Sequence, residues 1–161
     1  MADERLVMQP IGIIRTPFLE QKGTPIQPSE SGSTLGVVHV DPPYREALAD
    51  LDGFERIWLL FCFDRSKPWQ PRVVPYRDVM PRGLFATRAP SRPNAIGLSV
   101  VKLLSVSHDQ LEVQGVDMLD GTPILDIKPY VPEFDAFPQS RAGWLDESQT
   151  RRQRADPRFQ G

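Results

Sequence analysis

Cysteine and histidine are scarce in the 161-residue sequence, which contains one cysteine, Cys62, and two histidines, His39 and His108. A lone cysteine cannot form an intramolecular disulfide, and the flanking Phe61 and Phe63 predict that Cys62 is a small buried side chain. The two histidines are far apart and have no Cys or His neighbour at metal-ligand spacing. We therefore expect neither a disulfide nor a metal site.

Signatures of membrane insertion, secretion and several common enzyme classes are also missing. No apolar run approaches the length of a membrane span, and the N-terminus has no signal-peptide pattern, so we expect a cytoplasmic protein without a membrane partner. No GxGxxG or GxxxxGK[ST] motif is present, which argues against dinucleotide and P-loop sites. There is no GxSxG motif, and Ser99 has no nearby histidine to activate it.

Proline is abundant, with 17 of 161 residues, and this leaves little room for long helices. Apolar runs rich in β-branched and aromatic residues recur between turn residues, a pattern typical of strands. The predicted strands cover residues 11–15, 34–40, 56–63, 83–88, 96–106, 111–118 and 123–131. Only residues 41–51 and 146–154 have helical character. This pattern predicts a mostly all-β fold, either an antiparallel sheet or a closed barrel.

The net charge of −2 conceals two segments of opposite sign. Residues 65–92 hold seven basic side chains and one acidic one, whereas residues 109–135 hold seven acidic side chains and one lysine. One interpretation is that the two segments pair with each other and are otherwise solvated. The other is a basic rim that follows a polyanion, next to an acidic strand pair that carries chemistry.

The last predicted strand has a polar face. Period-2 alternation places four residues on a core face and four on the opposite face. The core face comprises Pro123, Leu125, Ile127 and Pro129, and the opposite face comprises Ile124, Asp126, Lys128 and Tyr130. The turn Asp120-Gly121 places another carboxylate beside this strand. The polar face is either a functional constellation or a solvent-exposed strand face with a salt bridge.

A loop between two apolar runs holds two arginines, Arg88 and Arg92, and two prolines, Pro90 and Pro93. The prolines stiffen the loop and reduce the entropy lost on binding. A guanidinium can bind a carboxylate or phosphate in a bidentate manner, or stack on a base. Composition and spacing therefore indicate a small anionic or nucleotide-like ligand.

Three ordered motifs resemble the TsaA-like family, whose better-known members are the TrmO enzymes. They are PIGIIRTPF (10–18), FATRAPSRPNAIGLS (85–99) and DMLDGTPILDIKPYVPEFD (117–135). The resemblance implies a small antiparallel β-barrel over residues 6–137. The residues that follow, 138–161, are a polar, Arg-rich tail. It also implies a homodimer with S-adenosylmethionine bound near the subunit interface. The expected reaction is methylation of N6 of an already modified adenosine, the threonylcarbamoyl adenosine next to the tRNA anticodon.

The same resemblance assigns the site residue by residue. The cofactor-binding residues it implies are Pro25, Ile26, Gln27, Asp64, Arg65, Arg88, Leu98, Leu119, Asp120, Gly121 and Thr122. The catalytic candidates are Asp120, Asp126, Lys128 and Tyr130, with Asp120 or Asp126 as the acceptor of the amine proton. Ala89 and Ala95 stand where family members usually have Ser and Pro, which affects the fine geometry of the loop.

The basic segment is the expected tRNA surface, because cations contact phosphates and aromatic rings stack on unpaired bases. Its candidates are Arg72, Arg77, Arg82, Arg92 and Trp69. Two simpler alternatives stay open: Arg92 pairs with an acidic residue, and Trp69 is an ordinary half-buried tryptophan. At the level of function, the alternatives are an S-adenosylmethionine-binding module without catalysis, or a methyltransferase for a smaller substrate.

Overall fold

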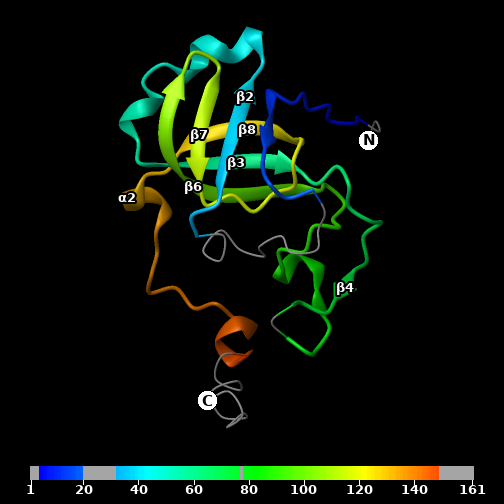
Figure 1. Cartoon of the computed structure of the whole chain (residues 1–161). Helices are drawn as coiled ribbons and strands as arrows, with labels where there is room; N and C mark the ends of the chain where they lie inside the picture. Colours follow the sequence, from blue (N-terminus) through cyan, green and yellow to red (C-terminus); the bar gives the residue numbers. More distant parts are fainter. Residues whose placement is uncertain (1–3, 20–31, 77, 149–161) are drawn as a thin grey trace.

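A closed barrel of six antiparallel strands forms the centre of the protein (Figure 1). The computed structural model describes residues 4–19, 32–76 and 78–148. The barrel strands are β1 (Gly12–Arg15), β2 (Leu35–Val40), β3 (Arg56–Cys62), β6 (Ile96–Ser107), β7 (Gln110–Gln114) and β8 (Thr122–Pro129). Their order around the barrel is β1-β2-β7-β6-β3-β8, and β8 pairs with β1 to close it. The predicted antiparallel barrel is confirmed.

Strand β3 shows how the sequence fills the barrel. Ile57, Leu59 and Phe61 alternate toward the interior and are at most 3% exposed. The intervening residues point outward, and Cys62 is one of them. The prediction of a buried Cys62 is therefore wrong, because the side chain lies half-buried on the outer face. Burial and the nearby Asp64 carboxylate nevertheless raise the pKa of the Cys62 thiol above its ordinary value.

Gly97 allows β6 to pass directly over the Phe61 ring. A Cβ atom at this position would lie 2.4 Å and 2.5 Å from two ring carbons of Phe61. Because such contacts are far below the sum of the van der Waals radii, only glycine fits here without repacking. The close packing of the Phe61 ring therefore determines where the β6 backbone runs at Gly97, directly before Leu98.

The pairing of β8 with β3 contains a β-bulge. Leu60 lies opposite Asp126, but the next residue, Phe61, lies opposite Ile124, so Leu125 is extra. The bulge reverses the alternation, and Ile124, fully buried, points into the core. The predicted core face is wrong for the first half of this strand, because a strict period of two cannot anticipate a bulge.

A small substructure lies beside the barrel. It consists of β4 (Arg72–Val73), β5 (Arg82–Gly83) and the 3-10 turn η3 (Leu84–Ala86). The predicted strand at 83–88 is wrong beyond Gly83, because the chain turns back on itself. The amide and the hydroxyl of Thr87 both donate to the Leu84 carbonyl, and the Leu84 side chain is buried.

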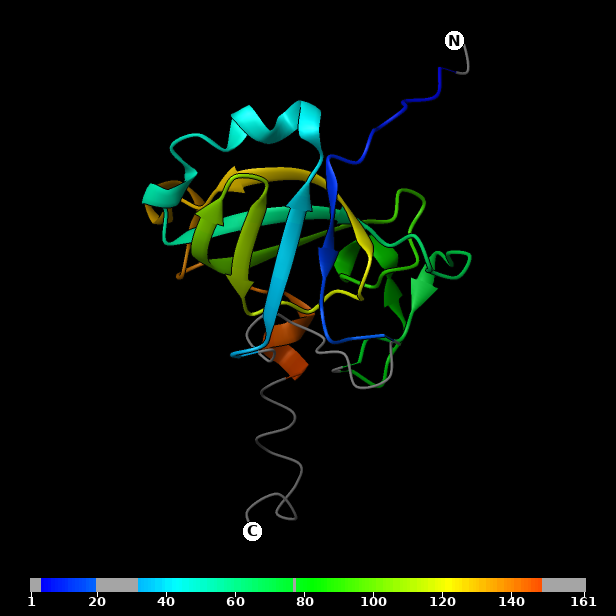
Figure 2. The same cartoon turned by 45° about the horizontal axis from the view of Figure 1, so that its top comes forward.

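The helical segments are short. The predicted helix at 41–51 forms two 3-10 helices, η1 (Pro42–Leu48) and η2 (Leu51–Gly53), and η1 lies across one end of the barrel (Figure 2). Helix α2 (Pro132–Asp135) follows β8, and residues 144–148 are also helical. None of the helices in the described part of the chain has the length and apolarity needed to cross a membrane.

Candidate functional site

Two predicted site segments meet at the end of the barrel where β3 finishes and β8 begins. The Arg65 guanidinium donates through Nη2 to the carbonyl oxygen of Asp120 at 2.7 Å and to Oγ1 of Thr122 at 3.4 Å. Its Nε lies 3.5 Å from Oδ1 of Asp64. The structure therefore brings Asp64 and Arg65 together with the turn of residues 119–122.

The turn at 119–122 is held rigidly. Gly121 has a φ of +79°, a left-handed conformation that favours glycine. The Thr122 hydroxyl donates to the Leu119 carbonyl at 2.6 Å. The Asp120 carboxylate accepts the Thr16 amide at 3.0 Å and the Arg15 guanidinium at 3.4 Å. Asp120 thus fixes the turn to the end of β1, and only 26% of its side chain is exposed.

Leu98 lies on the outer face of the barrel, in one row with a predicted catalytic residue. It pairs with Leu60 of β3, which in turn pairs with Asp126 of β8. Leu98 is 47% exposed, so its side chain faces away from the barrel core. The row places an apolar side chain and a carboxylate on the same surface, next to the barrel end that holds the 119–122 turn.

The remaining catalytic candidates lie further along this face. Lys128 Nζ lies 3.0 Å from Asp126 Oδ2, and the two side chains are 61% and 46% exposed. Asp126 Oδ1 accepts the amide of Ile127 at 2.9 Å. The Tyr130 ring packs edge-on against Trp58, with 5.8 Å between ring centroids. One of the two interpretations of this polar strand face is a solvent-exposed face with a salt bridge, and the structure contains that salt bridge.

The two arginines of the proline-rich loop have different environments. Arg92 Nη1 donates to the carbonyls of Leu84, Thr87 and Ala89, at 3.4, 2.9 and 3.2 Å. Arg92 therefore organises residues 84–92, hereafter the Arg88 loop, instead of pairing with an acidic residue. Arg88 itself is exposed and makes no hydrogen bond or ion pair with any other residue that the structure describes. Its guanidinium is available to a ligand.

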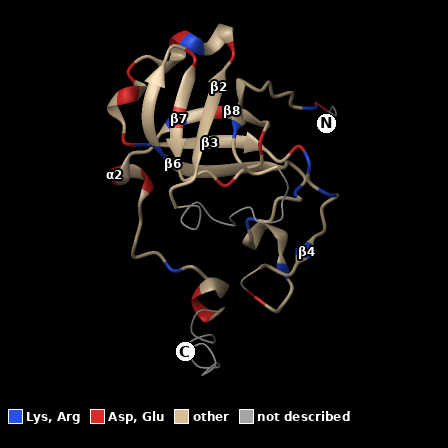
Figure 3. Cartoon of the chain, in the orientation of Figure 1, with Lys and Arg blue, Asp and Glu red and all other residues tan. Residues whose placement is uncertain are grey.

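Basic residues gather around the β4–β5 substructure (Figure 3). Arg72 is exposed and Trp69 is 49% exposed. Arg82 instead pairs with Asp78, with 2.7 Å from Nε to Oδ2. Among the described residues no ion pair joins the basic segment 65–92 to the acidic segment 109–135. Mutual pairing therefore does not account for the charge asymmetry in this part of the chain.

Some predictions fall outside the described residues, namely those for Pro25, Ile26, Gln27 and Arg77, and those for residues 149–161 of the Arg-rich tail and of the predicted helix at 146–154. Within the described residues, no cluster of three or more His, Cys, Asp or Glu side chains is arranged to hold a metal ion.

Asp117 is the first residue of the 117–135 motif but is not among the site residues that the sequence predicts. Its Oδ1 accepts the hydroxyl of Ser99 at 2.9 Å, and Ser99 is only 2% exposed on the inner face of β6. Burial raises the pKa of Asp117 from 3.8 to about 6, although the Ser99 hydrogen bond opposes the rise. This bond ties the strand of Leu98 to the segment that leads into the 119–122 turn.

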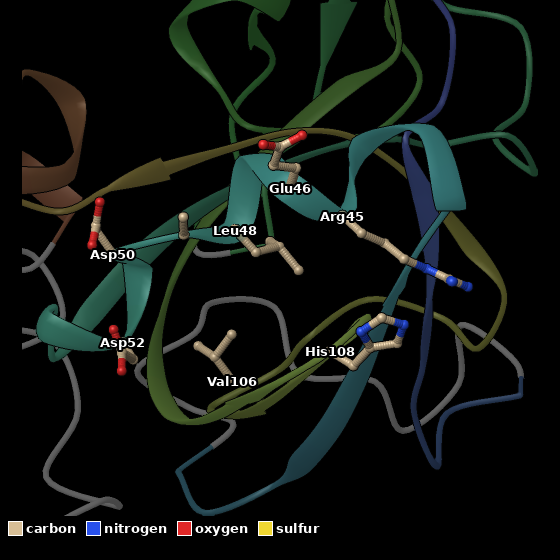
Figure 4. A pocket seen from close by; sticks show the side chains of 8 residues that line it. Arg45, Glu46, Leu48, Asp50, Asp52, Val106 and His108 are labelled. Carbon is tan, nitrogen blue, oxygen red and sulfur yellow. The ribbon is translucent and has the colours of Figure 1, made fainter.

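An open groove of about 380 Å³ lies at the other end of the barrel (Figure 4). It is bordered by η1 and by the β6–β7 turn, with Arg45, Asp50 and His108 among its lining side chains. Strand β6 runs from Ile96 near the site to Ser107 near this groove, so the groove is separate from the site.

Comparison with known proteins assigns the family. The model of the tRNA-methyltransferase O N-terminal domain matches residues 13–136. A Pyrococcus abyssi protein named "Probable S-adenosyl-L-methionine-binding protein" is 47% identical over 153 residues, which span 94% of this chain and 83% of that protein. The tRNA (adenine(37)-N6)-methyltransferase of Escherichia coli is 38% identical over 148 residues, which span 86% of this chain but 63% of the enzyme.

Solved structures agree with this assignment. The crystal structure of TrmO from Pseudomonas aeruginosa superposes with a TM-score of 0.77 and 41% identity. The match covers 89% of this chain and 64% of the Pseudomonas chain. This chain thus spans about two thirds of the longer bacterial relatives and most of the Pyrococcus one. It belongs to the family of the tRNA-methyltransferase O N-terminal domain.

Proposed function

We propose that this protein is an S-adenosylmethionine-dependent methyltransferase that methylates N6 of threonylcarbamoyl adenosine next to the tRNA anticodon. The observation that carries the proposal is the family match over residues 13–136, which covers the barrel from the second residue of β1 to the end of β8. The convergence of residues 64–65 with the 119–122 turn supports it, because this arrangement offers a pre-formed site.

The described residues fit the chemical groups of S-adenosylmethionine. Its carboxylate requires a cation, and Arg88 offers an exposed guanidinium. Its adenine requires an apolar surface, and Leu98 offers one at the rim of the site. Its sulfonium is favoured by carboxylate and carbonyl oxygens, such as those of residues 119–120. When bound, the cofactor supplies an electrophilic methyl group. The protein positions the amine in line with it and excludes water.

The amine must also lose a proton, and a carboxylate within hydrogen-bond reach can accept it. Asp120 and Asp126 are both candidates. The Asp120 carboxylate already accepts two hydrogen bonds from β1 and its end, whereas that of Asp126 pairs with the exposed Lys128. Replacing each with asparagine separates their roles. Loss of turnover with unchanged cofactor affinity identifies the base, and loss of affinity identifies a positioning role.

The tRNA surface proposed is the β4–β5 substructure. Arg72 offers a cation for phosphate, and exposed rings lie in the same segment, with Trp69 at 49%, Tyr76 at 78% and Phe85 at 82% exposure. Exposed aromatic rings among arginines are typical of surfaces that bind unpaired bases. The guanidinium of Arg92 makes its contacts within the Arg88 loop. Arg92 therefore contributes to tRNA binding indirectly, because it sets the conformation of this loop.

The outer face of β6 and β3 supports the proposed homodimer. Ile96 and Leu98 are 38% and 47% exposed there, next to Leu60 and the half-buried Cys62. Exposed apolar side chains that adjoin one another on a sheet favour a protein contact. Sedimentation at micromolar concentration tests this. If the protein is a monomer and still binds S-adenosylmethionine with full affinity, the cofactor site does not depend on a subunit interface, and this part of the proposal is wrong.

The competing function is S-adenosylmethionine binding without catalysis. It predicts that the purified protein binds the cofactor in a calorimetric titration but transfers no labelled methyl group to tRNA. The proposed function predicts binding and transfer together, and transfer only to tRNA that carries the threonylcarbamoyl group. Absence of cofactor binding would contradict both functions.

A further inference from the structure

The C-terminal segment returns to the Arg88 loop. After α2 the chain crosses toward the β4–β5 substructure, and the short helix at 144–148 lies close to it (Figure 1). Trp144 at the start of this helix donates its Nε1–H to the carbonyl oxygen of Ala86 at 2.7 Å. The Arg82 guanidinium lies over the Trp144 ring, 5.5 Å from its centroid. One side chain thus contacts β5 and η3 together.

The segment that carries Trp144 has a defined local structure. Gly143 has a φ of +56°, which allows the chain to turn sharply into the helix. The Ala142 amide donates to Oδ2 of Asp146 at 2.8 Å, and the Leu145 amide donates to the Ala142 carbonyl. Ser148 is only 6% exposed at the other end of this short helix. Trp144 is therefore presented by an ordered turn.

The partner of the Trp144 ring is fixed as well. Arg82 Nη2 lies 2.6 Å from Oδ2 of Asp78, whose side chain is 3% exposed. Burial alone would raise the pKa of Asp78, but hydrogen bonds from the Val79 amide and the Arg82 guanidinium lower it below its ordinary value. The carboxylate therefore stays charged and holds the guanidinium against the ring.

The carbonyl that Trp144 binds belongs to the Arg88 loop. Arg92 gathers the carbonyls of Leu84, Thr87 and Ala89, and the Ala86 carbonyl between them goes to Trp144. Hydrogen bonds within the loop thus set its shape. Trp144, which lies outside the loop, binds it at Ala86, two residues before Arg88. On the barrel side, the buried Leu84 secures the start of the loop.

We propose that Trp144 is a positioning residue that holds the Arg88 loop in the conformation that binds the cofactor carboxylate. The inference rests on the proposed function only for the identity of the ligand. The C-terminal segment is then part of the cofactor site, although Trp144 itself touches neither cofactor nor substrate. Loss of the Trp144 contact removes one of the restraints on the loop, and cofactor binding must then order the loop further.

The test uses the full chain and three variants. Trp144→Ala removes both contacts, and Trp144→Phe keeps a ring for Arg82 but loses the hydrogen bond to Ala86. Phe137→Ala is the control, since it removes an exposed ring, at 71% exposure, from the same segment. Calorimetry gives the affinity for S-adenosylmethionine, thermal unfolding gives the folded fraction, and hydrogen exchange of the cofactor-free protein reports on the Thr87 and Ala89 amides.

We expect Trp144→Ala to bind S-adenosylmethionine about tenfold more weakly, and Trp144→Phe about threefold, both while fully folded at the assay temperature. Exchange of the two loop amides should rise in both variants and stay unchanged in Phe137→Ala. If exchange of the Thr87 and Ala89 amides is unchanged in Trp144→Ala, the Trp144 contact does not restrain the loop and the proposal is wrong. Faster exchange with unchanged affinity would overturn its link to the cofactor. A wild-type protein that binds no S-adenosylmethionine would refute the proposed function instead. Hydrogen exchange of the Thr87 and Ala89 amides would then still show whether Trp144 restrains the loop.

Discussion

Replacing Asp117 with asparagine should stabilise the protein at neutral pH. The carboxylate lies largely buried beside Ser99, and burial raises its pKa from 3.8 to about 6. A rise of this size means that ionising Asp117 costs the folded state about 3 kcal/mol relative to the unfolded chain. Asparagine carries no charge, and its amide oxygen can still accept the Ser99 hydroxyl.

The pH dependence has a definite sign. Below pH 3.8 Asp117 is protonated in both states, so its contribution to stability is fully present. As the pH rises toward 6, the unfolded chain releases the proton while the folded protein retains it, and this contribution is lost. Above the folded-state pKa of about 6 the loss is complete and constant. Asp117→Asn should therefore match the wild type near pH 4 and exceed it by up to about 3 kcal/mol at pH 8.

Urea unfolding of both proteins at several pH values measures this difference. Other carboxylates titrate over the same range, but their effects cancel in the comparison of variant and wild type. Ser99→Ala is the matched perturbation, because it removes a donor to the charged form and should destabilise the protein at pH 8 more than at pH 4. A difference between Asp117→Asn and wild type that does not vary with pH would refute the reasoning.

Three further results are expected. Gly97→Ala should lower the free energy of unfolding by about 1–3 kcal/mol, measured by urea unfolding, because its Cβ meets the Phe61 ring; an unchanged value would contradict this packing. Arg65→Gln should weaken S-adenosylmethionine binding about tenfold in calorimetry, because it releases the 119–122 turn, and equal affinity would show that the turn needs no such support. Arg72→Glu should weaken tRNA binding and reduce its salt dependence by about one phosphate contact, whereas Arg5→Glu, the same charge change in the N-terminal segment, should not; equal effects would indicate a nonspecific charge response.

The sequence predicted the barrel strands well where local pattern decides. The pattern predicts strands at residues 56–63 and 96–106, and β3 and β6 occupy nearly the same positions. The pattern failed where tertiary contacts decide. At 83–88 the burial of Leu84 and the bonds from Thr87 close a turn in a stretch that has strand composition. In β8 one extra residue, Leu125, moves Ile124 into the core.

The candidate site shows the same division. The DGTP turn could be placed from its Asp-Gly signal, and Gly121 has the positive φ that this signal indicates. The different environments of Arg88 and Arg92 could not be predicted, because they depend on which carbonyls the folded loop presents. The Trp144 contact spans 58 positions in sequence and leaves no local pattern. The hydrogen bond from Ser99 to Asp117 joins residues 18 positions apart and likewise leaves no local pattern.

Nucleoside mass spectrometry tests the central claim most directly. Purified protein is incubated with isotopically labelled S-adenosylmethionine and bulk tRNA from cells that make threonylcarbamoyl adenosine but do not methylate it. The proposed function predicts a labelled methyl group on threonylcarbamoyl adenosine and on no other nucleoside. If that nucleoside stays unlabelled while the protein binds S-adenosylmethionine in a parallel titration, the barrel serves another acceptor or none, and the proposed reaction is wrong.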